Sequence, residues 1–352
     1  MIKLPGLIDI HVHLREPGES YKEDFSTGSA AALAGGITTV FAMPNTNPPI
    51  LDNESFSSAA ELAGAKAYCD YGIYLGGGEH NAKKAAEISG QAVGMKLYLD
   101  ATYGPLLLEH LSSWIEHFEH WPRSRPIVAH AEEKTLAAYL TLSYLFQRPV
   151  HVCHVSRKDE IFLIREAKRK GLPVTCEVTP HHLFLTEEDE RSMPTGRAKV
   201  SPRLASAEDQ QALWENLPII DCIASDHAPH TLQEKDSEQA PPGFPGLETT
   251  LPLLLTAVQE GRLQLEDIIE KMFINPKKIF SLSGQEDTWV EVDETHSYEI
   301  NGSDLFTKAK WTPFEGKRVQ GLVKRVVIRG ETVYQDGKTL VKPGFGKNIR
   351  NI

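Results

Sequence analysis

Short apolar runs alternate with amphipathic stretches from the start of the chain to about residue 260. The runs have the length and composition of buried strands, and the stretches between them have helical length and spacing. This alternation is typical of a parallel sheet with crossover helices. The predicted strands are Leu7–His13, Thr38–Met43, Tyr71–Leu75, Gly94–Leu99, Ile127–His130, Val150–Val155, Val174–Val178 and Asp221–Ser225. The predicted helices are Ser26–Ala34, Glu54–Ala67, Leu106–His120, Leu136–Gln147, Asp159–Lys170 and Glu208–Leu217.

Eight such units predict an α/β fold of the (β/α)₈ TIM-barrel type. The alternative is a doubly wound open sheet, which would carry a glycine-rich phosphate turn after its first strand. Here the first strand instead runs into His11 and His13. We therefore predict the closed barrel.

After about residue 285 the pattern changes to short strands around turns such as Asp336-Gly337. The chain is expected to form a barrel domain, residues 1–285, and a small β-rich appendage packed on it, residues 286–352. A loop rich in proline and glycine, Gln233–Gly246, follows the eighth barrel strand. The predicted strands of the appendage are Thr288–Val292, Tyr298–Ile300, Val319–Ile328 and Thr332–Tyr334.

Candidate chemistry gathers where the barrel strands end, which is the face that carries active sites in such barrels. His11 and His13 are two residues apart on one strand, so both side chains are expected to point toward the barrel axis. One strand-end histidine alone is more often a structural residue than a ligand. Several on one rim together with an aspartate indicate a metal site. The expected ligands are His11, His13, Lys96, His130, His154 and Asp226.

Lys96 is unusual in this set, because an ammonium group repels a metal ion. Its plain interpretation is a strand lysine that extends its amine to solvent. Beside four histidines, however, the amine could react with carbon dioxide. The resulting carbamate would be an anionic ligand able to bridge two cations.

Charge and composition exclude several partners. The chain has 48 acidic and 37 basic residues, a net charge of −11, which argues against binding nucleic acid or an anionic membrane. Apolar runs such as Leu251–Val258 are far shorter than the roughly 20 residues of a membrane span. The four cysteines lie in or beside apolar runs, as in reduced intracellular proteins, and the first residues lack a signal-peptide pattern. We expect a cytoplasmic protein.

Several motifs carry a resemblance that covers essentially the whole chain. Gly6–Gly18, Ala42–Thr46, Gly94–Tyr98, Ala129–Glu132 and Ala224–His230 resemble dihydroorotases of the amidohydrolase superfamily. More narrowly, Val174–Leu183, Pro242–Thr249 and Trp311–Gly316 are similar to the dihydroorotase domain of animal multifunctional pyrimidine-synthesis proteins.

The resemblance implies a reversible hydrolase that interconverts N-carbamoyl-L-aspartate and L-dihydroorotate in de novo pyrimidine (UMP) synthesis. It implies one zinc ion on His11, His13, carboxylated Lys96 and Asp226, and a second on Lys96, His130 and His154. A hydroxide bridging the two ions would be the nucleophile. Asp226 would act as general acid and base in addition to binding metal.

The resemblance also assigns the substrate carboxylate to Arg15, Asn45 and His230. A surface salt bridge is the alternative for Arg15. The segment after the fourth strand, with Thr102 and Tyr103, is expected to form a lid over the substrate; an ordinary turn is the alternative. The backbone of Pro242 and Gly243 is expected to contact the ring.

A third zinc ion touching Cys153 and Glu177 is a weaker expectation, because Cys153 should point away from its neighbour His154 on an ideal strand. A buried thiol is the alternative.

Three functions remain open from the sequence. The first is dihydroorotase. The second is another cyclic-amide hydrolase, such as a hydantoinase, dihydropyrimidinase or allantoinase, against which Arg15 and His230 argue. The third is a non-catalytic dihydroorotase-like scaffold, against which the intact ligand set argues. The resemblance further implies a homodimer, and fusion to or association with aspartate transcarbamoylase and carbamoyl phosphate synthetase domains.

Overall fold

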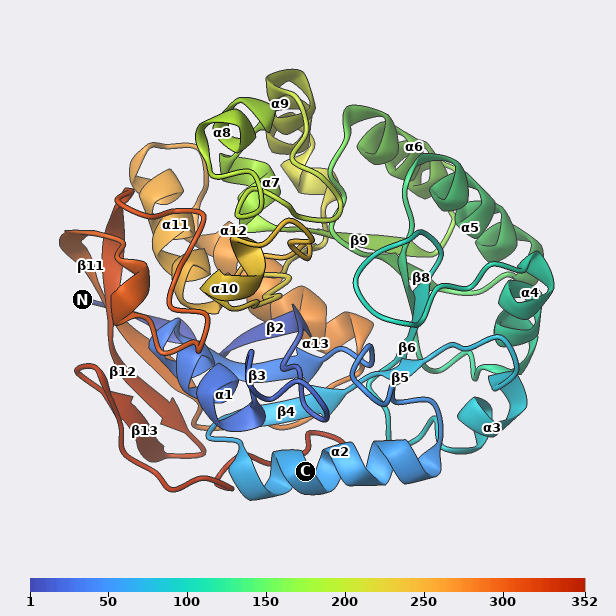
Figure 1. The fold of residues 1–352 in the computed structure, drawn as a ribbon, viewed down its shortest axis with the longest axis horizontal. Helices are drawn as coiled ribbons and strands as arrows, with labels where there is room; N and C mark the ends of the chain where they lie inside the picture. Colours follow the sequence, from blue (N-terminus) through green and yellow to red (C-terminus); the bar gives the residue numbers. More distant parts are fainter. Residues whose placement is uncertain (352) are drawn as a thin grey trace.

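Parallel strands close into a barrel in the computed structural model, which describes residues 1–351 (Figure 1). The chain passes from β4 to β5 through Tyr74, whose N–H donates to Ala42 O at 3.0 Å, so these two segments form one barrel position. The barrel closes where Val12 bridges His227, and His13 N–H donates to His227 O at 2.8 Å. The predicted eight-position barrel is therefore confirmed. Its strands are β2 (Leu7–Val12), β3 (Ile37–Ala42), β4 (Asp70–Ile73), β5 (Leu75–Gly76), β6 (Met95–Tyr98), β7 (Ile127–His130), β8 (Val150–Val152), β9 (Val174–Val178) and β10 (Cys222–Ile223).

Helices surround these strands on the outside (Figure 1). The six predicted helices are present as α1 (Phe25–Ala34), α2 (Asn53–Lys66), α4 (Leu111–His120), α5 (Glu133–Phe146), α6 (Lys158–Arg169) and α9 (Ala207–Glu215). The pattern did not predict α3 (Ala82–Glu87), α7 (Pro180–Phe184), α8 (Glu187–Ser192), α10 (Leu232–Lys235), α11 (Leu247–Gln259), α12 (Leu265–Ile269) or α13 (Asn275–Ile279). Short 3₁₀ turns lie at Leu217–Ile219 and Gly302–Asp304, and a π-helical turn lies at Glu270–Ile274.

The start of α4 differs from the prediction. Residues 106–110 are not helical, because Leu107 bridges Tyr98 and the carboxylate of Glu79 accepts the N–H of Glu109 at 2.7 Å. The helix therefore begins at Leu111 rather than at Leu106.

Apolar side chains fill the barrel interior away from the carboxyl ends of its strands. The polar groups lie at the carboxyl ends. Ile8 and Ile10 of β2 belong to an interior cluster that includes Phe41, Tyr74 and Phe280. A register irregularity between Asp9 and Val12 disturbs the usual alternation of β2. Ile10 can therefore pack in this cluster while its neighbour His11 also points into the barrel.

An antiparallel sheet forms the appendage, at the left of Figure 1. Its strand order is β1 (Ile2–Pro5), β11 (Trp289–Glu299), β12 (Arg318–Ile328), β13 (Glu331–Gln335) and β14 (Lys338–Thr339). The two strands predicted over residues 288–300 are one strand, β11, with register irregularities. β1 was not predicted; it pairs with β11, so the beginning of the chain joins this sheet. The division into domains at residue 285 stays a prediction. No helix within residues 1–351 is long and apolar enough to span a bilayer.

Candidate metal centre and active site

His11 of β2, His13 just beyond its end and an aspartate beyond β10 converge at the carboxyl end of the barrel. His11 Nε2 lies 3.3 Å from Asp226 Oδ1, and His13 Nε2 lies 3.2 Å from the same oxygen. Their candidate ligand atoms all lie within 4.8 Å of one another, and all three side chains are buried. Imidazole nitrogens and a carboxylate oxygen at this spacing can share one cation.

The other predicted ligands lie beside this group. His130 Nδ1 and His154 Nε2 are 2.9 Å apart, and the rings of His154 and His11 have centroids 5.2 Å apart. Lys96 is fully buried, and its Nζ donates to Cys153 Sγ at 2.8 Å. The six predicted residues therefore surround one volume at the barrel end.

The protonation states suit metal binding. Burial lowers the pKa of His13 to about 4 and holds the pKa of His154 well below its usual value. Burial would raise the pKa of Asp226, but the neighbouring His11 and His13 outweigh it and hold that pKa well below its usual range. Neutral imidazole and ionised carboxylate are the forms that coordinate cations.

Hydrogen bonds from outside the centre orient His11 and His13. His11 Nδ1 contacts the Glu177 carboxylate, which also accepts from His151 Nε2 at 3.1 Å. His13 Nδ1 lies 2.8 Å from Asn45 Oδ1. These partners occupy Nδ1 of each ring and leave Nε2 to face the centre, the arrangement found around metal-binding histidines.

Three residues at the site also have strained backbone. Arg15, His154 and Asp226 have φ values of 59°, 32° and 44°, in the left-handed region that side-chain-bearing residues avoid. Such strain persists where the surrounding structure holds it, and it clusters at functional sites. Cys153 and His154 can both reach the interior because β8 ends at Val152. The alternation of side chains expected along an ideal strand therefore does not apply to these two residues.

Cys153 and Glu177 lie close enough to form a second candidate metal group. Ligand atoms of His11, Cys153 and Glu177 lie within 4.8 Å of one another. In the structure the thiol accepts from Lys96 and the carboxylate is held by two histidines. The third zinc site stays a prediction.

The predicted carboxylate-binding residues meet on one side of the centre. Arg15 is 3% exposed; its Nε donates to Pro229 O at 3.1 Å, and its Nη2 lies 3.0 Å from His230 Nε2. The same His230 nitrogen lies 3.1 Å from Pro242 O. Arg15 forms no salt bridge among residues 1–351, so its guanidinium is available to an anion. This arrangement differs from the surface salt bridge considered as its alternative.

The segment after β6 covers this subsite. Asn45 Nδ2 donates to Tyr103 O at 2.8 Å, and the Tyr103 and His230 rings meet edge to face with centroids 4.8 Å apart. The Tyr103 hydroxyl accepts from Lys22 Nζ at 2.5 Å and contacts Glu19. Thr102 precedes it on the same partly exposed segment. A covering segment at this position supports the predicted lid.

Gly243 brings backbone close to His230. Its φ is 142°, and a Cβ there would lie 2.5 Å from Ala228 O, so a side chain would not fit. A glycine is required for this approach.

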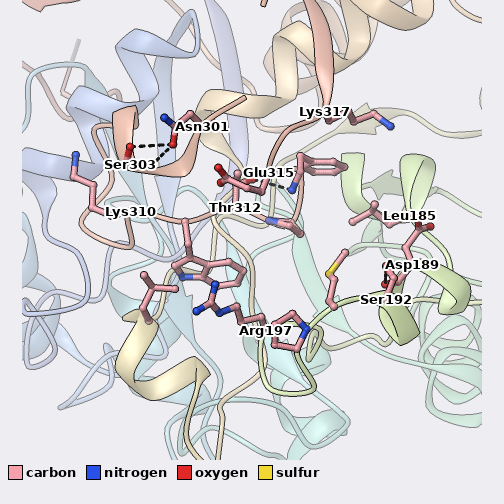
Figure 2. Close-up of a pocket in the computed structure, with 16 residues that line it drawn as sticks. Leu185, Asp189, Ser192, Arg197, Asn301, Ser303, Lys310, Thr312, Glu315 and Lys317 are labelled. Atoms are coloured by element: carbon pink, nitrogen blue, oxygen red, sulfur yellow. Dashed lines mark hydrogen bonds between the residues drawn. The ribbon is translucent and has the colours of Figure 1, made fainter. Parts of the chain in front are cut away.

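A separate cavity of about 560 Å³ lies between the 185–197 segment and the 301–317 segment (Figure 2). None of the predicted site residues lines it. Its wall includes Trp311, whose indole N–H donates to His230 O at 2.8 Å, so it lies behind the carboxylate subsite.

Comparison with known proteins agrees with this geometry. The model of the amidohydrolase family matches residues 2–285. The chain belongs to the amidohydrolase family. It is 57% identical to the multifunctional protein CAD of Squalus acanthias over 99% of this chain and 16% of that protein. It is 40% identical to the dihydroorotase of Pyrococcus furiosus, over 99% of this chain and 87% of that enzyme.

Solved structures of this family include an L-hydantoinase from Arthrobacter aurescens, with a TM-score of 0.94, 29% identity and coverage of 99% of this chain and 88% of that one. Another is an inactive dihydroorotase-like domain of a Chaetomium thermophilum CAD-like protein, with a TM-score of 0.85, 31% identity and 99% coverage of both chains. The chain spans 16% of the length of two multifunctional relatives that it matches over 99–100% of its own length. The predicted kinship with CAD-type dihydroorotase domains is confirmed.

The sequence analysis missed several buried polar residues around the site. His151 supports Glu177, and Lys22 and Lys235 lie near His230 with 1% and 0% exposure. No local pattern marks these lysines: Lys22 lies in an irregular segment, and Lys235 ends the four-residue helix α10. Their burial depends on contacts with distant parts of the chain.

Proposed function

We propose that this domain is a metal-dependent dihydroorotase, a hydrolase of cyclic amides that interconverts N-carbamoyl-L-aspartate and L-dihydroorotate. The observation that carries the proposal is the position of Arg15 and His230 beside the candidate metal centre. A cationic anchor at that place suits a cyclic amide that carries a carboxylate. The 40% identity to an archaeal dihydroorotase along 87% of that enzyme supports the same substrate.

The donor set fits zinc, which binds imidazole nitrogen and carboxylate oxygen. His11, His13 and Asp226 would hold one ion, and His130 and His154 the second. Among residues 1–351, the buried amine of Lys96 has Cys153 Sγ as its hydrogen-bond partner and no carboxylate. Carboxylation by carbon dioxide would convert Lys96 into an anionic ligand shared by both ions. Two zinc ions bound there would lower the pKa of a bound water and polarise the scissile amide carbonyl.

Asp226 handles the proton. Its carboxylate lies between His11 and His13, and its pKa is well below the usual range, so it is ionised and able to accept a proton as the ring is attacked. The lowered pKa accounts for the ionised form alone; the proton that Asp226 accepts comes from the attacking water or hydroxide, and Asp226 then delivers it to the departing ring nitrogen. During ring closure Asp226 first accepts a proton from the attacking nitrogen and then donates a proton to the departing oxygen.

Arg15, Asn45 and His230 orient the substrate through its carboxylate. Arg15 provides a planar pair of donors and His230 adds a ring N–H, while the backbone of Pro242 and Gly243 contacts the ring amide. Thr102 and Tyr103 close over the bound substrate and exclude water. Orientation by fixed groups lowers the entropic part of the barrier.

The assembly around this domain is also a proposal. Because multifunctional relatives of this chain are much longer than the chain, we propose that it works beside aspartate transcarbamoylase and carbamoyl phosphate synthetase domains in pyrimidine synthesis, in the cytoplasm and as a homodimer. A third zinc ion on Cys153 and Glu177 remains part of this proposal.

The test is ring opening measured on protein whose metal content is determined in the same sample. Zinc-loaded protein should open L-dihydroorotate and leave hydantoin nearly untouched. Zinc-loaded protein that opens hydantoin instead would favour the second function. Loaded protein inactive on both rings would favour a scaffold.

A further inference from the structure

Lys235 is a buried lysine whose ammonium is bonded to backbone alone. It lies at the end of α10 with 0% exposure. Its Nζ donates to Lys199 O at 2.8 Å, Pro241 O at 2.9 Å and Gly243 O at 3.2 Å. An ammonium has three N–H donors, so these three carbonyls satisfy all of them. The rings of Trp311 and Phe244 lie 5.4 and 5.6 Å from Nζ, within cation–π range.

Two of the three carbonyls that Lys235 contacts, those of Pro241 and Gly243, belong to the segment beside His230. Pro241 and Gly243 flank Pro242, whose own carbonyl lies 3.1 Å from His230 Nε2. Gly243 N–H donates to Lys199 O at 3.0 Å, which closes the network. Lys235 thereby joins two stretches of chain and fixes the 241–243 backbone against the His230 ring.

The charge of Lys235 has no acidic partner within residues 1–351. Lys22, the other buried lysine near His230, is balanced by Glu19 at 2.7 Å and Glu234 at 3.1 Å. No carboxylate pairs with Lys235, and the charged groups that act on it are the cations Lys199 and Arg15. Burial, with these two cations, lowers the pKa of Lys235 to about 7. An anion beside His230 would supply the missing negative charge.

Burial together with Arg15, Lys22 and Lys235 lowers the pKa of His230 strongly. His230 therefore lies in the positive field of all three cations. Of these three cations, Arg15 and Lys235 are the two that form no salt bridge with a carboxylate among the described residues, whereas Lys22 pairs with Glu19 and Glu234.

We infer that Lys235 is a positioning residue for the substrate carboxylate: its ammonium fixes the 241–243 backbone against His230 and adds positive charge behind that subsite. The inference rests on the proposed dihydroorotase function. Lys235 does not touch the substrate; it acts through His230 and through the Pro242 and Gly243 backbone. Its loss should therefore weaken substrate binding more than it slows the chemical step.

The test compares Lys235→Met with Lys235→Arg and with Lys271→Met as a matched control. Lys271 is also buried, at 3% exposure, and its Nζ donates to Ile220 O at 2.8 Å near the opposite end of the barrel. We expect Lys235→Met to raise KM for L-dihydroorotate roughly tenfold, the effect of one charge-assisted contact, with kcat changed less than about threefold. Lys235→Arg should recover most of the KM, and Lys271→Met should lower thermal stability without raising KM.

A KM within about twofold of wild type in folded Lys235→Met would overturn the inference, as would an equal KM rise in Lys271→Met. If Lys235→Met does not fold, Lys235→Gln replaces it, because glutamine keeps hydrogen-bond donors and loses the charge. Equal KM values for Lys235→Gln and Lys235→Arg would then overturn it. Wild-type protein that fails to open dihydroorotate when loaded with zinc contradicts the proposed function itself, which separates the two failures.

Discussion

Replacing Arg15 by methionine isolates the contribution of the carboxylate anchor. The guanidinium is 3% exposed, and Pro229 O, His230 and the Tyr103 ring hold it in place. A hydrogen bond to a charged group contributes about 1.5–3 kcal/mol, so loss of a two-point contact should cost about 3 kcal/mol, or roughly 150-fold in kcat/KM. Methionine and lysine must adopt the same left-handed backbone at φ 59°, so the variants differ in head group rather than in strain.

The assay measures kcat/KM for L-dihydroorotate and for dihydrouracil, which is the same ring without the carboxylate. Arg15→Met should lose about two orders of magnitude on dihydroorotate and little on dihydrouracil, and Arg15→Lys should fall between wild type and Arg15→Met, because a lysine keeps the charge but not the planar fork. An equal loss on both rings would refute the reasoning, because Arg15 would then support the site as a whole.

Four further predictions follow from other contacts. Asp226→Asn should lower kcat by about 10²–10⁴-fold while bound zinc, measured by elemental analysis, is largely retained; normal turnover would contradict its role as acid and base. Lys96→Ala should lose the two-metal site and therefore its activity. If Lys96→Ala keeps two zinc ions per chain, carboxylation of Lys96 is contradicted. Tyr103→Phe should keep the ring contact with His230 but lose the hydroxyl contacts with Lys22 and Glu19, so KM should rise less than in Tyr103→Ala; equal effects would argue against the ring as the covering group. Burial, with Glu23 nearby, raises the pKa of Glu248 from 4.5 to about 7, so the native state holds a proton that the unfolded chain releases in this interval. Stability should then fall as pH rises between these values, by up to about 1.4 kcal/mol per pH unit from this group, and Glu248→Gln should flatten the slope of unfolding free energy against pH. An unchanged slope of unfolding free energy against pH in Glu248→Gln would contradict a native state in which Glu248 holds this proton.

The barrel, and the position of the histidines at its carboxyl end, could be predicted because their signals are local. Each barrel strand is a short apolar run, and the residue where the run ends is also the residue that reaches the active face, as for His130 at the end of β7. A strand-end histidine can therefore be placed without knowledge of its neighbours. Arg15 and Asn45 lie three residues beyond the ends of β2 and β3, but their task was expected from the family resemblance and not from the strand pattern.

Other features depend on contacts between distant residues and have no local signal. Ile2–Pro5 is a strand only because it pairs with the segment around Val292. The start of α4 is set by Glu79, which belongs to another segment. Lys235 is polar and was predicted to lie in a proline-rich loop, whereas the structure places it at the end of α10 with its side chain buried.

The measurement that tests the central claim most directly is ring opening of L-dihydroorotate, and the reverse ring closure of N-carbamoyl-L-aspartate, by the purified domain before and after removal of zinc. The account predicts that both directions proceed in the zinc-loaded protein, cease when a chelator removes the metal, and return when zinc is restored. Turnover that survives complete metal removal, or zinc-loaded folded protein that converts neither compound, would contradict it.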